Sequence, residues 1–202
     1  MCSQICNNKG AARMPRDTRS ALLALAETAA RSRGFDGFSF ADLANGVGIR
    51  KASVHHHFPT KADLSTEMMR NYSEKLEQTL HEVAGNAPNA AARLSALVGI
   101  YRDALGKGDS LCLCVSLAAV RDNLTDAAIV EMAAFRVMMK TWIAGCFAVA
   151  LSDRSIQVVG DPNEEAASVL AQLEGAQIAA RVAKDIAYFD AALALFLRRL
   201  PD

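Results

Sequence analysis

The sequence has few of the residues that build sheets and no run that suits a membrane span. Aromatic residues make up only 6% of its 202 residues. Ala and Leu are abundant, which favours helix over strand. The only β-like run, residues 155–160, is too short to build a sheet, and the longest apolar run, residues 142–151, is far shorter than a bilayer-spanning helix. These absences predict an all-α chain with no membrane partner.

Disulfide and secretion signals are also missing. The five cysteines are odd in number, and their spacing does not form a disulfide framework: Cys2, Cys6, Cys112, Cys114 and Cys146. Residues 1–20 are polar and lack the apolar stretch of a secretory signal. We therefore expect a reduced, cytoplasmic protein with a flexible arm over residues 1–14, in which Met14 is an alternative to Met1 as the start of translation.

No pattern of catalytic chemistry is visible. The chain has no nucleophile–base spacing, no phosphate-binding loop and no cluster of metal ligands, so we expect no catalytic residues, no cofactor and no metal. The three consecutive histidines at 55–57 are the nearest approach to a metal site. Successive helical residues point about 100° apart, however, and cannot converge on one ion.

Charge is distributed unevenly along a chain whose net charge is zero. Residues 1–64 carry nine Lys or Arg against five Asp or Glu, a net charge of +4, and residues 65–202 carry thirteen against seventeen, a net charge of −4. A basic amino-terminal segment on a mildly acidic body suits a nucleic-acid-binding head joined to a regulatory body.

Local signals divide the first 83 residues into four helices. Apolar spacing predicts a helix over 18–33, and Ser39, with Asp42 three residues later, caps a short helix that ends near residue 46. A turn at 47–48 leads to a helix over 50–57. Pro59 cannot continue that helix, and Thr60 caps a long helix over 61–83.

Residues 18–64 resemble the DNA-binding domain of the TetR family of bacterial transcriptional regulators. The resemblance is carried by a first helix that ends in Gly34-Phe35, by the block FSFADLANGVGIRKASVHHHF and by the segment PTKADL at 59–64. It is detailed over the first third of the chain and extends to the rest only as a pattern of helices. It implies an all-α fold with a three-helix helix-turn-helix head over 15–60 and a six-helix ligand-binding and dimerisation body over 61–202.

The resemblance also implies which residues meet double-stranded DNA. A short helix that is buried on one face and carries cations and hydrogen-bonding groups on the other suits a major groove. The helix starts at 39 and 60–61 offer further groups for phosphates. The predicted DNA-binding residues are Ser39, Arg50, Lys51, Ala52, Ser53, His55, His56, His57, Thr60 and Lys61.

In the body, helices are expected over 89–105, 110–122, 126–152, 163–183 and 186–200. Soft and aromatic side chains in the middle helices suit a pocket for an apolar effector, with core packing as the alternative. The predicted pocket residues are Tyr101, Cys112, Cys114, Phe135, Met138, Met139 and Trp142.

The last two helices have apolar faces that suit a homodimer interface, with closure of the monomer core as the alternative. The predicted interface residues are Leu173, Gly175, Ala176, Gln177, Phe189, Leu193 and Phe196. Dimerisation would pair two heads on a palindromic operator.

Together these features predict a ligand-responsive transcriptional regulator, most simply a repressor that a small apolar effector releases from its operator. One alternative is a thiol-based redox or electrophile sensor that uses Cys112 or Cys114 in the same scaffold, and a more distant one is a helical enzyme. The sequence does not decide between repression and activation.

Overall fold

The computed structural model describes residues 18–200, and within that range the chain is helical with no strand. The all-α prediction is therefore confirmed for this part. The predicted arm at 1–14, with Cys2, Cys6 and Met14, lies outside the described residues.

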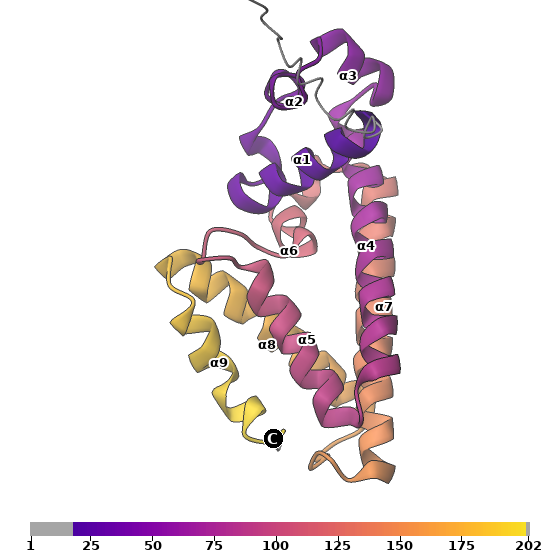
Figure 1. Ribbon diagram of the computed structural model, residues 1–202, viewed down its shortest axis with the longest axis vertical. Coiled ribbons are helices and arrows are strands. Elements are labelled where there is room, and N and C mark those ends of the chain that lie inside the picture. The colour runs from indigo at the N-terminus through magenta and orange to yellow at the C-terminus, as the bar shows by residue number, and fades with distance from the viewer. Residues whose placement is uncertain (1–17, 201–202) are drawn as a thin grey trace, which may run out of the picture.

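Three helices form a head at one end of the molecule (Figure 1). They are α1 (Thr18–Arg33), α2 (Phe40–Val47) and α3 (Lys51–His57), with a 3-10 turn, η1 (Phe35–Gly37), after α1. Their inner faces meet in a small apolar core in which Leu22 and Val54 are fully buried. This burial fixes which face of α3 remains exposed.

The body is built along two long helices, α4 (Lys61–Asn86) and α7 (Asp126–Asp153), which pack against each other. In turn α7 packs against α8 (Pro162–Ala183), and α8 against α9 (Ala187–Leu197). Helix α5 (Ala90–Ala104) contacts α4, α7 and α8. Figure 1 shows α4 descending directly from the head.

The shortest body helix, α6 (Leu113–Ala118), lies next to α1 and is followed by a second 3-10 turn, η2 (Arg121–Asn123). It is shorter than the helix expected over 110–122. Before it, residues 105–112 form an irregular loop that includes Gly108, whose φ is +85°. A Cβ there would lie 3.1 Å from the backbone of Lys184 and Asp185, so the loop is pressed against the end of α8.

Two helix starts follow the capping pattern expected from the sequence. The Ser39 hydroxyl accepts from the backbone N–H of Asp42 at 3.3 Å, while the Ser39 backbone N–H donates to the Asp42 carboxylate at 2.7 Å. The same reciprocal pair joins Thr60 and Asp63. Each N-cap contributes about 1 kcal/mol, and together they set the starts of α2 and α4.

Helix α7 is longer and more apolar than the short apolar runs of the sequence indicate. By length and composition α7 is apolar enough to cross a membrane, with a third of its most apolar 18-residue window buried. The uninterrupted apolar run at 142–151 is shorter than this window. The isolated polar residues that interrupt the window do not bring its mean hydropathy below that of a membrane-spanning helix. A core helix passes the same test, and α7 packs against α4, α5 and α8.

Candidate DNA-binding surface and effector region

The exposed face of α3 carries polar and basic side chains. Arg50 at its N-cap and Lys51, Ala52 and Ser53 in its first turn are exposed, while Val54 points into the head core. These four predicted DNA-binding residues are thus exposed together around the start of α3, in the head. Contact with DNA remains a prediction.

The three histidines have different surroundings. His55 and His56 are exposed and His57 is half-buried. The His55 Nδ1 lies 3.2 Å from the carbonyl oxygen of Pro59, and its ring packs edge-on against Phe40 with the centroids 4.9 Å apart. Within residues 18–200 no group of three or more His, Cys, Asp or Glu is arranged to hold a metal ion.

Ser39 and Thr60 are exposed, but their hydroxyls are already engaged. The Ser39 hydroxyl donates to the Asp42 carboxylate at 2.8 Å, and the Thr60 hydroxyl donates to the Asp63 carboxylate at 2.7 Å. Because these protons are used inside the capping boxes, a phosphate could receive them only by displacing a carboxylate.

Lys61, which was predicted to bind a phosphate, makes contacts within the chain. Its ammonium donates to the backbone carbonyl of Phe38 at 2.6 Å and lies 4.4 Å and 4.8 Å from the ring centroids of Phe38 and Phe35. Burial lowers the pKa of Lys61. The side chain thus ties the start of α4 to the segment between α1 and α2, a contact that local sequence does not reveal.

The predicted effector residues fall into two groups. Tyr101, Cys112, Cys114, Phe135 and Met139 are buried, none more than 2% exposed. The other two, Met138 and Trp142, are half-buried and line a surface groove of about 490 Å³ between α4 and α7. These seven residues therefore do not share one pocket surface.

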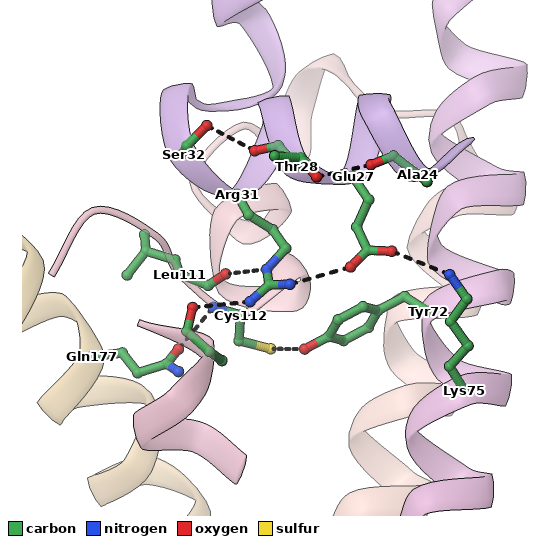
Figure 2. A network of polar contacts seen from close by, with 11 residues as sticks. Ala24, Glu27, Thr28, Arg31, Ser32, Tyr72, Lys75, Leu111, Cys112 and Gln177 are labelled. Carbon is green, nitrogen blue, oxygen red and sulfur yellow. Dashed lines mark hydrogen bonds and ion pairs between the residues drawn. The ribbon is translucent and has the colours of Figure 1, made fainter. Parts of the chain in front are cut away.

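A chain of polar contacts, the interior cluster, joins α4, α5 and α8 through Cys112 at the end of the 105–112 loop. The Tyr72 hydroxyl of α4 donates to the Cys112 sulfur at 3.4 Å, and the Cys112 backbone N–H donates to the Gln177 side-chain carbonyl at 2.9 Å (Figure 2). The Gln177 side-chain amide donates to the Tyr101 carbonyl at 2.8 Å. Tyr72 is absent from the sequence-based set, because nothing near it in sequence shows that it faces Cys112.

The thiols in this cluster are not activated. Burial raises the pKa of Cys112, and burial raises the pKa of Cys114 to about 12. A thiol reacts as its thiolate, so neither is a good nucleophile near neutral pH. This environment opposes the thiol-sensor alternative.

The end of α1 is bonded to the body. A helix leaves its last four carbonyls without partners inside the helix. Here the Ala30 carbonyl accepts from the Ser116 hydroxyl at 2.6 Å, the Arg31 carbonyl accepts from the Leu111 N–H at 3.0 Å, and the Ser32 carbonyl accepts from Arg181. Body groups thus donate to three of the last four carbonyls of α1, of which the Ala30 carbonyl also accepts from the Gly34 N–H at 3.0 Å.

The Arg31 side chain reinforces this junction. Its Nε donates to the Leu111 carbonyl at 2.8 Å, another guanidinium nitrogen donates to the Ala104 carbonyl at 2.9 Å, and a third pairs with Glu27 at 3.2 Å (Figure 2). The N–H and the carbonyl of Leu111 are therefore both hydrogen-bonded to Arg31 of α1. The next residue, Cys112, is hydrogen-bonded to Tyr72 and Gln177 in the interior of the body. Segment 111–112 connects the head to the interior.

A surface pocket of about 320 Å³ opens beside this junction, where α1, α4 and α5 meet. Its lining is mixed: the apolar groups of Tyr72, Ile100 and Ala104 lie beside charged side chains, which are Glu27, Arg31, Lys75 and Asp103. Because the Tyr72 ring lines the pocket while its hydroxyl reaches Cys112, the pocket lies next to the interior cluster.

The last helix pair corrects the predicted interface set. Six of the seven residues are buried inside the monomer, and only Gly175 is exposed: the buried ones are Leu173, Ala176, Gln177, Phe189, Leu193 and Phe196. They close the monomer core, which was the alternative left open by the sequence. The exposed large apolar residues of this pair are instead Ile178, Val182, Tyr188 and Leu195, at 49–82% exposure.

Both the sequence and the fold are similar to those of known proteins. The family model described as "Bacterial regulatory proteins, tetR family" matches residues 22–68, which cover most of the head and the start of α4. The structure of a TetR-family transcriptional regulator from Agrobacterium tumefaciens superposes with a TM-score of 0.86 at 27% identity, covering 93% of this chain and all of that one. Residues 22–68 thus match the TetR family, and the fold as a whole is similar to that of a TetR-family regulator.

Two curated helix-turn-helix regulators are similar to this chain over shorter stretches. The repressor KstR2 of Rhodococcus jostii is 29% identical over 92 residues, which are 46% of this chain and 45% of that protein. The regulator CymR of Pseudomonas putida is 38% identical over 48 residues, 24% of each chain. The chain thus spans less than half the length of these curated relatives. Fold and relatives are those of transcriptional regulators, not of enzymes, as the sequence predicted.

Proposed function

We propose that this chain is a cytoplasmic transcriptional repressor of the TetR family that binds a palindromic operator as a homodimer and is released by a small apolar effector. The observation that carries the proposal is the exposed polar face of α3, presented at the tip of a head whose first helix is capped by body groups. The proposed domain division keeps the head at 15–60 and the body at 61–202.

Dimerisation follows from the reach of one recognition helix. The seven residues of α3 can contact only a few base pairs, so two heads related by two-fold symmetry are needed for a specific site. The exposed apolar residues of α8 and α9, Ile178, Val182, Tyr188 and Leu195, are the surface we assign to the second copy.

The effector would act through segment 111–112. A molecule that enters from the pocket beside Tyr72 and displaces Cys112 would move Leu111, which is bonded to Arg31. The position of α1 would change, and with it the distance between the two α3 helices. Such a ligand needs only to bind the displaced state better than the DNA-binding state.

Selection of duplexes from a random-sequence DNA pool, followed by mobility shift, tests the DNA-binding part. We expect enrichment of an inverted repeat, and a loss of at least tenfold in operator affinity for Lys51→Ala. The matched control is Lys140→Ala, which removes an exposed lysine from α7 and should leave operator affinity unchanged. Absence of any enriched sequence, or equal affinities of the two variants, would refute the proposal.

A further inference from the structure

Two phenol groups of the body, those of Tyr72 and Tyr101, both interact electrostatically with the Cys112 thiol. Tyr101 is 2% exposed, and its hydroxyl has no hydrogen-bond partner among residues 18–200. The Tyr72 hydroxyl donates only to the Cys112 sulfur, a weak acceptor. A buried donor without a partner costs about 1–3 kcal/mol, and native structures keep few of them. This pair of hydroxyls is therefore suited to receive an acceptor atom from a bound molecule.

The surroundings of the phenols are neutral. Burial raises the pKa of Tyr72 and of Tyr101 well above the usual range, so both groups are protonated donors. The neighbouring thiols of Cys112 and Cys114 are protonated for the same reason. A cluster of four neutral groups disfavours a charged ligand, because nothing in it offsets the loss of hydration.

The cations beside this cluster are already paired. The Arg136 guanidinium, which interacts with the Cys114 thiol, donates to the Glu174 carboxylate at 2.7 Å. The Arg31 guanidinium lies 5.9 Å from the centre of the Tyr72 ring, but its three nitrogens bond Leu111, Ala104 and Glu27. An anionic ligand would have to break this junction to pair with it. On the inner side of Tyr72 the contact is apolar: the centroid of the Phe135 ring lies 5.7 Å from that of the Tyr72 ring.

We propose that the Tyr72 and Tyr101 hydroxyls form the polar end of the effector site and bind a neutral carbonyl oxygen of an otherwise apolar molecule. The inference deepens the proposed function, because it assigns a ligand class to the effector. The surface pocket of about 320 Å³ that Tyr72 lines is the entry. A carbonyl is a stronger acceptor than a thiol, so it takes the Tyr72 hydroxyl from Cys112 and frees segment 111–112.

The test uses three aromatic probes of similar size: acetophenone, which carries a ketone, ethylbenzene, which lacks the oxygen, and benzoate, which is anionic. Each is titrated into the full chain by calorimetry or ligand-observed NMR. We expect acetophenone to bind about tenfold more tightly than ethylbenzene, the factor for one net hydrogen bond, and benzoate to bind more weakly than acetophenone.

Variants show whether the phenols cause the preference. In Tyr101→Phe the affinities for acetophenone and ethylbenzene should agree within about twofold, whereas Tyr188→Phe, which changes an exposed tyrosine on α9, should keep the tenfold preference. Equal affinities in the wild type, binding of none of the probes, benzoate as the tightest ligand, or a preference that survives in Tyr101→Phe would each overturn the inference.

Stability of the ligand-free protein gives a second readout. Tyr101→Phe should melt no lower than the wild type, because the hydroxyl has no partner to lose. A melting point lowered by several degrees would show that the hydroxyl is already bonded and would also overturn the inference. Neither readout involves DNA: ketone selectivity without operator binding refutes only the proposed function, and operator binding without ketone selectivity refutes only this inference.

Discussion

The tip of the head and the interior of the body use polar side chains in opposite ways. On α3, Arg50, Lys51 and Ser53 stand in solvent, and one short helix sets their spacing. In the body, Tyr72 and Gln177 come from helices far apart in sequence and meet at Cys112. The comparison teaches that the head surface depends on local geometry, whereas the interior cluster depends on the packing of the whole body.

The two regions also differ in energetics. Exposed cations contribute to DNA binding mainly by releasing counterions, an effect that falls with salt and leaves protein stability unchanged. Buried polar groups contribute to stability only while each is paired, and removal of one partner leaves the other unsatisfied. Substitutions of paired, buried groups in the body should therefore lower stability, and those on the exposed face of α3 should change DNA binding.

The largest effect is expected at Gln177, which is fully buried and makes two hydrogen bonds. Gln177→Leu should lower the free energy of unfolding by about 2–4 kcal/mol, because the Cys112 N–H and the Tyr101 carbonyl lose their partner. Urea unfolding followed by circular dichroism measures this. Gln172→Leu, an exposed control on the same helix, should change it by less than about 0.5 kcal/mol. Similar losses in both variants would remove the contrast between the two regions.

A smaller loss is expected at the junction. Arg31→Ala removes the donors to Leu111 and Ala104 and should cost about 1–3 kcal/mol, because both carbonyls lie in a partly buried site. The control is Arg33→Ala, an exposed arginine two residues later. Equal unfolding midpoints for the two variants would show that the junction contributes nothing to stability.

Lys61 and Lys51 separate binding from stability within the head. Lys61→Met should lower stability by about 1 kcal/mol through loss of its bond to Phe38 and its ring contacts. It should leave the salt dependence of operator binding unchanged. Lys51→Met should instead reduce the slope of log affinity against log salt by about 0.9, the value for one phosphate contact, without changing stability. A reduced slope in Lys61→Met would support the sequence-based prediction for that residue.

The smallest effect concerns the thiols. In a Cys2→Ser, Cys6→Ser background, iodoacetamide should not modify the folded chain at pH 8, because burial holds Cys114 and Cys146 protonated with pKa values of about 12 and also raises the pKa of Cys112. Modification should become rapid in urea. Mass spectrometry follows the reaction, and fast labelling of native Cys112 or Cys114 would revive the thiol-sensor alternative.

Local signals in the sequence were sufficient for most of the fold. The capping pairs at Ser39 and Thr60 and the turn at Gly48, whose φ is +77°, involve residues within a few positions of one another. The helix expected over 110–122 was too long because its first residues bond to Arg31 and Gln177, which are distant in sequence.

The exposure of the predicted site residues could be inferred from sequence only where it follows from the geometry of one helix. The α3 face met that condition. Lys61 did not, because its partner Phe38 lies 23 residues away. In α8 and α9 both faces are apolar, so periodicity could not show that Leu193 packs inward while Leu195 is 73% exposed.

The central claim is that segment 111–112 transmits the state of the interior to the head. Native-state hydrogen exchange at the Leu111 amide, which donates to the Arg31 carbonyl, tests this claim directly. In Tyr72→Phe, which releases Cys112, we predict exchange at Leu111 about tenfold faster than in the wild type, as expected for loss of about 1.4 kcal/mol of local protection. Exchange at Phe58 in the head core should stay unchanged. Unaltered protection of Leu111 in Tyr72→Phe would contradict the account.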